Sequence, residues 1–458
     1  MKGGTRMQIP VTMNMAQKYA VSPDNSACTF QFLKKNFGCS RKVYNLCVDD
    51  LYRQLEETGY QPGDRIPKTT VPKASELKKQ YPYLKEADSL GIANSIMDFR
   101  DSLARFCKQP SHKAYTKRAL RRDTSGTEKL SFRGLKGIPK FHAKAQGYFS
   151  YRTACQYPDK KNSLNRPTIR LEGGRLYLPK LKEGLKLIVH RDLPADAHIN
   201  NVTVSMDTDG TIYASISYSH TIMVEMSLQD AAMDSGALPE GISFLGLDYS
   251  QKDFYVDSEG RKANCPKYYR ESERRLAMLQ KKLSRQEKGG KNYQKTLKKI
   301  QDLHTKTRNQ RKDFLHKEST LLVSEYDVIV VEDIDLRGMG AALSLGKNLH
   351  DNGFGMFRFM LAYKLRRKGS CLVKVSRWYP SSRTCSCCGH VLEDLKLSER
   401  TYVCPCCGMV MDRDHNAAVN IREEGKRIFP EYLRNLVLSE QAAAESAMKR
   451  KKGRPAAA

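Results

Sequence analysis

The apolar residues in the first half of the chain follow two different spacings. A short strand-like stretch opens the sequence, and from residue 30 to about residue 122 apolar side chains recur at helical spacing, interrupted by Pro and Gly at 61–72. From 167 to 225, apolar and polar residues alternate between Gly and Asp-Gly turns. These patterns predict a helical region followed by a small antiparallel β-module.

The second half of the chain mixes strands with helices. Two strands of a hairpin are expected after Gly241, and YDVIVVEDIDL is typical of a buried strand that ends in acid. Leucines at helical spacing occupy 261–320, where Gly289-Gly290 divides a helical hairpin. A helix near 354–369, a strand in SCLVKVSRW, a helix in AAVNIREEGKRI and a low-complexity basic tail follow. The predicted fold class is therefore α+β.

The length of the chain predicts several domains, and its charge predicts a class of binding partner. The chain has 458 residues, with 79 Lys and Arg against 50 Asp and Glu and a net charge of +29. Single cores stop growing at roughly 250–300 residues, so we expect more than one domain. The cationic excess argues against an ordinary neutral metabolic enzyme. It favours a polyanion as partner, nucleic acid before an anionic membrane surface.

The sequence also indicates in which cellular environment the protein works. The N-terminus has no sustained apolar segment, and no run of 18 apolar residues occurs anywhere. We therefore expect no membrane association and a reducing environment. Clustered thiols in such an environment usually bind metal rather than form disulfides.

One cysteine cluster has the spacing of a metal site. Cys385-x2-Cys388 and Cys404-x2-Cys407 are separated by 15 residues, as in a four-cysteine zinc ribbon that holds one structural Zn²⁺. A glycine follows each pair, where a knuckle needs a residue tolerant of positive φ. Cys387 and Cys406 lie inside the knuckles and are expected to be spare. The alternative is a set of buried or redox thiols.

Three carboxylates stand at the ends of predicted elements. Asp248 ends the apolar run that begins at Ile242, Glu332 follows four apolar residues in the same way, and Asp414 immediately precedes the helix near Asn416. Acids from two strand ends and one helix start could together hold a pair of Mg²⁺ ions, which would activate water for phosphodiester cleavage.

Each of these acids has a structural alternative. Asp248 could be a turn residue of a hairpin, and Glu332 could belong to a strand-capping group with Asp333 and Asp335. Asp414 is also a good helix N-cap residue. Periodicity alone does not bring the three acids together in space.

At these residues the sequence resembles a known family. GLDYS, VIVVEDIDLRGM and the run from RWYPSSRTCSCCG through MDRDHNAAVNI are similar to the RuvC-like nuclease half of TnpB-type transposon-encoded RNA-guided nucleases, which compact type V CRISPR effectors share. The similarity is densest over 241–425 and weaker at NFGCSRKVYN and GIPKFHAKAQGYFSYRT. The cysteines of the first half show no paired spacing, which slightly favours a transposon-type or intermediate protein over the effectors that carry a second zinc site.

The resemblance implies an architecture. It predicts a split β-barrel wedge domain around a helical recognition domain, and an RNase H-like (RuvC) α/β nuclease domain that a zinc ribbon interrupts. The basic helical hairpin at 261–320 would belong to the nuclease domain. The implied boundaries are 1–24 and 131–228 for the wedge domain, 25–130 for the recognition domain, 229–240 for a linker, 241–380 and 411–428 for the nuclease domain, 381–410 for the ribbon and 429–458 for a basic tail.

The resemblance also implies an activity. Asp248, Glu332 and Asp414 match the three catalytic acids of the family, which implies a Mg²⁺-dependent DNA endonuclease that uses two metal ions. A guide RNA would supply sequence specificity, and the protein would read a short motif beside the target DNA. The implied location is the prokaryotic cytoplasm, near the nucleoid. A catalytically silent RNA-guided DNA-binding regulator and a protein-only RuvC-like resolvase stay open as alternatives, as does the choice between one and two protein copies on each RNA.

Two basic regions are candidate nucleic-acid contacts. Residues 261–320 contain 19 Lys and Arg against 6 Asp and Glu, an excess that repels itself unless phosphates neutralise it. A solvated helical face is the alternative. Near residue 150, aromatic rings alternate with cations, a mixture suited to stacking on unpaired bases, although core aromatics of a strand would look the same. The candidates are Arg308, Arg311, Lys312 and Lys317, with Lys144, Tyr148, Tyr151 and Arg152. For Trp378, the only tryptophan, we expect a packing role.

Overall fold

The chain folds into two compact units in a computed structural model. Thr12–Ile222 form the first unit, and Met223–Ala458 with Met1–Val11 form the second unit. In the part of the chain described below, no helix is both long and apolar enough to span a bilayer. The structure describes residues 8–64, 66–108, 114–116, 118–120, 131–144, 147, 149–159, 164–225, 241–250, 252–335, 353–395 and 399–452.

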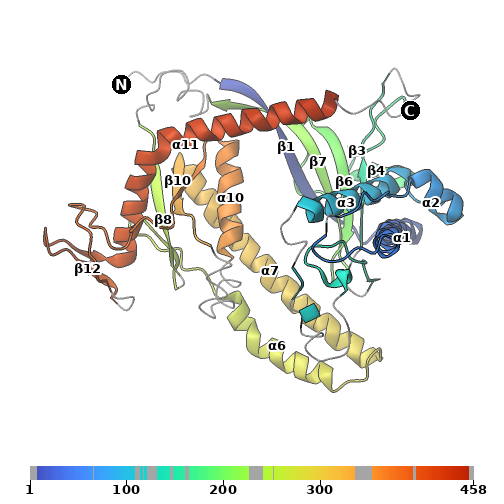
Figure 1. Ribbon diagram of the computed structural model, residues 1–458, viewed down its shortest axis with the longest axis horizontal. Helices are drawn as coiled ribbons and strands as arrows, with labels where there is room; N and C mark the ends of the chain where they lie inside the picture. Colours follow the sequence, from blue (N-terminus) through green and yellow to red (C-terminus); the bar gives the residue numbers. More distant parts are fainter. Residues whose placement is uncertain are drawn as a thin grey trace. The chain divides into compact units, whose positions relative to one another are not determined.

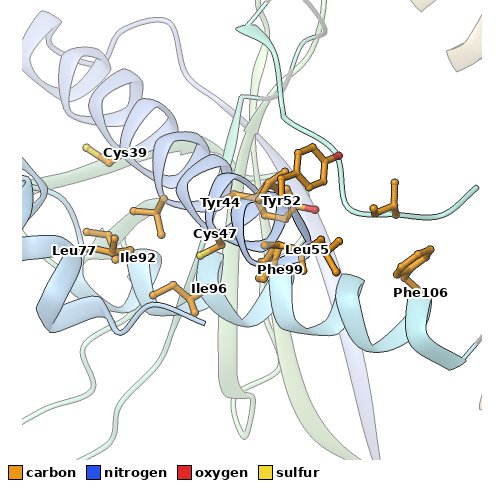
Figure 2. Packing of buried hydrophobic residues seen from close by; sticks show 14 of the residues in the cluster. Cys39, Tyr44, Cys47, Tyr52, Leu55, Leu77, Ile92, Ile96, Phe99 and Phe106 are labelled. Carbon is orange, nitrogen blue, oxygen red and sulfur yellow. The ribbon is translucent and has the colours of Figure 1, made fainter. Parts of the chain in front are cut away.

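Helices α1 (Ala27–Glu57) and α3 (Ser89–Lys108) form the helical part of the first unit together with shorter segments. The Ser26 side chain accepts a hydrogen bond from the Thr29 amide and so caps α1. Figure 2 shows Tyr44 and Cys47 of α1 lying against Phe99 of α3. This packing confirms the helical pattern of the sequence. The shorter segments are α2 (Ala74–Gln80), η1 (Pro82–Glu86) and η3 (Phe132–Gly134).

A seven-stranded antiparallel sheet completes the first unit. The strands are β1 (Gln8–Val21), β2 (Ser150–Ala154), β3 (Arg170–Glu172), β4 (Arg175–Leu178), β5 (Leu181–Ile188), β6 (His198–Met206) and β7 (Ile212–Glu225). Their order is β2-β6-β7-β1-β5-β4-β3. The first strand of the chain therefore joins strands that follow the helices in sequence. Among the described residues no pairing joins β2 to β3, so the sheet is open and the split barrel stays a prediction.

The second unit is built on a four-stranded mixed sheet. Its strands are β8 (Phe244–Ser250), β9 (Phe254–Asp257), β10 (Val328–Glu332) and β11 (Leu372–Val375), in the order β11-β10-β8-β9. Strand β10 runs parallel to both neighbours, and β8 pairs antiparallel with β9. A sheet that is covered on both faces needs continuous apolar strands, which explains the run from Val328 to Val331.

Helices cover the two faces of this sheet. Ile329 and Val331 of β10 face a cluster formed with α7 (Lys291–Glu325) and α10 (Phe354–Arg367), whereas Val328 and Val330 face α11 (Arg413–Lys452). Figure 1 shows α11 running across β8 and β10. The predicted basic hairpin is confirmed as α6 (Tyr268–Ser284) paired with α7, and Gly290 caps α7. The predicted α+β fold class is confirmed.

The C-terminal segment differs from the sequence prediction. Helix α11 continues to Lys452, and Phe429 and Leu433 are buried against the sheet. The predicted boundary at residue 429 therefore lies inside a helix that belongs to the core. The reason is that Phe429 and Leu433, four residues apart, extend the apolar stripe of the helix past Pro430. The predicted linker at 229–240 lies outside the described residues.

Candidate functional site

Asp248 and Glu332 lie side by side at one edge of the mixed sheet. Val331 of β10 is in register with Leu247 of β8, so the next residues of the two parallel strands are Glu332 and Asp248. Neighbouring strands are about 4.8 Å apart, and residues in register share a face of the sheet. Asp248 pairs with Val256 of β9 inside the strand and is not a turn residue. Clefts at the carboxyl ends of parallel strands commonly bind ligands.

Asp414 reaches this edge because α11 packs directly on the strands. A Cβ atom on Gly246 would lie 2.1 Å from the carbonyl oxygen of Ala418, so only glycine allows the helix backbone to approach β8 this closely. A Cβ atom on Gly425 of α11 would lie 2.4 Å from the side-chain atom Cγ2 of Val330 in β10. The sequence analysis did not single out these two glycines. The signal available was a glycine in the middle of an apolar strand.

The helix N-cap is Asp412 and not Asp414. The Asp412 carboxylate accepts hydrogen bonds from the backbone amides of Asp414 and His415, at 2.9 and 3.1 Å. That is the geometry of a side chain capping the first turn of a helix. The Asp414 carboxylate does not cap the helix, and Arg400 Nη1 lies 3.9 Å from it. The helix N-cap role, which the sequence left open for Asp414, is therefore filled by Asp412.

The surroundings of the three acids make each of them costly to ionise. Burial raises the pKa of Asp248 well above its usual value, and repulsion by Asp414 and Glu332 raises it further. Burial likewise raises the pKa of Glu332, against the nearby charge of Arg377. The pKa of Asp414 is raised by burial and then by Asp412. Carboxylates are the hard oxygen donors that divalent cations prefer. In the described part of the chain, however, the four paired cysteines discussed below are the group whose ligand atoms all lie within 4.8 Å of one another, so the three carboxylates are spaced more widely than that.

Glu332 also differs from its acidic neighbour. The Asp333 carboxylate lies 3.8 Å from Arg358 Nη1 and 3.5 Å from Lys374 Nζ. Arg358 additionally points Nη1 at the backbone carbonyl of Glu332, at 3.4 Å. Asp333 is therefore the acid that cations pair with at this strand end, whereas Glu332 faces Asp248.

The four paired cysteines converge. Their sulfur atoms all lie within 4.8 Å of one another, and Cys385 Sγ is 3.6 Å from Cys407 Sγ. Each knuckle is closed by local backbone bonds, such as Gly408 N–H to Cys404 O at 3.0 Å, and both following glycines have positive φ. A hydrogen bond from the Cys407 amide lowers the pKa of Cys404 to about 6, which favours the thiolate. Four convergent thiolates fit a tetrahedral metal site. Cys387 and Cys406 are exposed, as expected of spare residues.

Two asparagines connect the cysteine module to the start of α11. Asn416 Oδ1 accepts from the Ser386 amide at 3.0 Å, and Asn416 Nδ2 donates to Thr384 O at 2.7 Å. Asn420 Nδ2 donates to Ser381 O and Thr384 O. Both side chains are buried, so these bonds fix the helix that carries Asp414 against the module. Sequence reasoning missed both, and their spacing of four on one helix face was the only signal.

The basic candidates on α7 have different surroundings. Arg308, Lys312 and Lys317 are exposed, and Arg311 is half-buried. Lys317 forms an ion pair of 2.7 Å with Asp313, one helical turn away. All four lie on α7, and their contact with nucleic acid stays a prediction.

The candidate nucleic-acid contacts near residue 150 agree less well with the structure. Tyr151 is only 3 % exposed and packs inside the sheet core, so the prediction of base stacking is wrong for it. Strand alternation turns this ring inward, toward Phe37. Arg152 pairs with Asp98 at 2.6 Å, whereas Lys144 is exposed. Tyr148 lies outside the described residues.

The surroundings of Trp378 also differ from the prediction. Its side chain is 86 % exposed, so the expected packing role is wrong. The residue follows the end of β11, where the chain leaves the core toward the cysteine module.

Two family models match segments of the second unit. The first, described as "Cas12f1-like, TNB domain", matches residues 354–421, and the second, described as "Probable transposase", matches residues 222–342. All three acids and all four paired cysteines lie within these two segments.

Individual proteins are also similar to this chain. A proposed RNA-guided DNA endonuclease from Streptomyces pristinaespiralis is 29 % identical over 86 % of this chain and 85 % of its own length. Another from Escherichia coli K12 is 28 % identical over 67 % of this chain and 73 % of its own length. A solved Cas12f1–sgRNA–target DNA complex aligns with a TM-score of 0.45 and 12 % identity, over 90 % of this chain and 99 % of that one. A score below 0.5 does not by itself establish a shared fold.

Proposed function

We propose that the chain is an RNA-guided DNA endonuclease related to TnpB-type transposon-encoded proteins and Cas12f1-like effectors, a proposal that the matching family models and similar proteins support. A guide RNA would pair with the target DNA, and the protein would recognise a short motif beside the target. The single observation that carries the proposal is the strand register that sets Glu332 beside Asp248, with Asp414 near enough to raise the pKa of the buried Asp248.

The proposed chemistry is two-metal hydrolysis. Asp248, Glu332 and Asp414 would hold two Mg²⁺ ions, which supply an activated water and stabilise the leaving oxygen of a phosphodiester. The chain itself holds the acids in place: the strand register sets Glu332 beside Asp248, and the close approach of α11 at Gly246 brings Asp414 to them. Without metals, Asp414 and Glu332 repel the charge on Asp248, so bound cations would relieve a cost of ionisation that burial and these neighbours impose.

The proposed architecture follows from the same elements. An RNase H-like (RuvC) domain is supported by a mixed sheet with acids at the ends of two adjacent parallel strands and by α11 packed on its face. Cys385, Cys388, Cys404 and Cys407 would hold one structural Zn²⁺ within this domain. The open sheet of the first unit would be the wedge domain, with α1 to α3 as the recognition helices. Guide RNA and target DNA would be the partners, in the prokaryotic cytoplasm.

The decisive experiment is cleavage by the protein purified with its native RNA. We expect Mg²⁺-dependent cutting of a matched DNA, and we expect Asp248→Ala to abolish cutting while DNA binding is kept. Normal cutting by the alanine variant would refute the catalytic assignment. Binding without any cutting by the wild-type protein would favour a silent regulator, and full activity after RNase treatment would favour a protein-only resolvase.

A further inference from the structure

The only tryptophan of the chain stands almost fully in solvent. Trp378 is 86 % exposed, although tryptophan is one of the side chains that folding usually buries. Its backbone is nevertheless held on both sides: the Trp378 amide donates to Ser376 Oγ at 3.3 Å, and the following amide of Tyr379 donates to Ser376 O at 3.0 Å. The exposed indole is therefore carried by an ordered turn and not by an irregular segment without backbone hydrogen bonds.

The position of this turn links the indole to the acids. Val375, the last residue of β11, is in register with Glu332. Three residues of extended chain span at most roughly 10 Å, so Trp378 lies near the same edge of the sheet. The intervening Arg377 is exposed as well. An exposed guanidinium and an exposed indole thus directly follow the strand that is in register with Glu332.

This combination matches the chemistry of unpaired nucleic acid. An exposed ring can stack on a nucleobase, and a guanidinium beside it can bind phosphate. In a duplex the base faces are already stacked on one another and are not available to the indole. A protein partner would use the apolar ring equally well but would gain nothing from its place beside an acid edge that suits phosphate-bound metal.

We infer that Trp378 stacks on an unpaired base of the DNA strand presented to Asp248, Glu332 and Asp414, and so acts as a residue that positions the substrate. The inference rests on the proposed function. It assigns Trp378 to binding and not to the chemical step.

The residue gives its own signal, because all tryptophan emission of the chain comes from Trp378. The probe is an oligothymidylate added to the RNA-bound complex of an Asp248→Asn variant, which should not cut it. We expect the single strand to quench the emission, and a duplex of the same length to quench it much less. If a labelled strand binds by anisotropy and the emission is unchanged, the inference is wrong. Quenching that depends on protein concentration and not on DNA would also overturn it, in favour of self-association.

Variants give an independent readout. Trp378→Ala should raise KM for single-stranded DNA by about tenfold, which corresponds to about 1.4 kcal/mol of lost stacking, with little change in the rate at saturation. Trp378→Phe should restore most of the affinity. The control is Phe359→Ala, because Phe359 is an aromatic residue of the same unit that is 69 % exposed. An unchanged KM in Trp378→Ala, or an equal rise in Phe359→Ala, would contradict the inference.

Stacking and cutting can fail separately. If the protein never cuts DNA but single strands quench its emission, the proposed function is wrong and the stacking site is supported. If the protein cuts matched DNA and its emission is not quenched, the proposed function is supported and the stacking site is wrong.

Discussion

The second unit carries two clusters of metal-ligating side chains, and they are assembled in opposite ways. The four cysteines fall within 23 residues, and each pair is shaped by backbone hydrogen bonds inside its own knuckle. The three acids come from β8, β10 and the start of α11, which are far apart in the sequence. The cysteine cluster is thus a local structure, whereas the acid cluster exists only when the sheet and α11 are in place.

Both clusters make some of their own members costly to ionise. Backbone amides of Cys407 and Cys406 face Cys404 and lower its pKa, whereas burial and the other three sulfur atoms raise the pKa of Cys388. Burial raises the pKa of Asp248, and repulsion by Asp414 and Glu332 raises it further. A bound cation would relieve this cost in either cluster, so the contrast between the two lies in their assembly. The following variants test this contrast.

The largest effect is expected at the acids. Glu332→Gln should reduce DNA cleavage on the order of 10³-fold, about 4 kcal/mol of transition-state stabilisation, because one ligand of the metals is lost. The matched control is Asp333→Asn, since the neighbouring acid forms only weak surface ion pairs with Arg358 and Lys374. Single-turnover cleavage rates measure both. Equal losses in the two variants would mean that general charge, and not a specific ligand, matters at this strand end.

The cysteine cluster offers an equally close pair. Cys404→Ser should remove the bound zinc and unfold the knuckles locally, because structural zinc provides much of the stability of such a module. Cys406→Ser should keep the zinc, since Cys406 is exposed and outside the four. Metal content and hydrogen exchange over 385–407 measure the effect. Retention of zinc by Cys404→Ser would show that the four sulfurs are not the ligand set.

Backbone packing should matter for the acids in particular. Gly246→Ala should lower the free energy of unfolding by about 3 kcal/mol and impair cleavage, because the added methyl group meets the backbone of α11. Gly38→Ala is the control, since a Cβ atom at Gly38 in α1 meets nothing within 4 Å. That change should stabilise α1 by about 0.5–1 kcal/mol. Chemical denaturation distinguishes the two, and a neutral Gly246→Ala would refute the close approach.

The smallest effect concerns the contact between the two clusters. Asn416→Ala should cost about 1–3 kcal/mol, because the Ser386 amide loses its partner at the edge of the cysteine module. Zinc content should be unchanged, whereas cleavage should fall as Asp414 loses its support. Asn309→Ala, on the exposed face of α7, should change the free energy of unfolding by less than about 0.5 kcal/mol. Loss of zinc from Asn416→Ala would mean that the cluster also depends on the helix.

Sequence patterns predicted the elements better than the surroundings of single residues. The helical hairpin with its break at Gly289-Gly290 and the buried strand before Glu332 are confirmed, because leucine spacing and apolar runs reflect burial directly. The predictions for Tyr151 and Trp378 were wrong in opposite ways, because Tyr151 is buried and Trp378 is exposed. Whether an aromatic side chain faces the core depends on strand phase and on the course of the chain after a strand, and neither is encoded in the residue type.

The sequence by itself determined the cysteine module, because paired spacing and the two glycines act within a few residues of the chain. It also determined the presence of three candidate acids at the ends of elements. Only the tertiary structure decided that Glu332 lies in register with Asp248, that Asp412 caps α11 in place of Asp414, and that Gly246 lets the helix approach. The physical reason is that register and backbone contact arise between elements far apart in sequence, where local patterns carry no information.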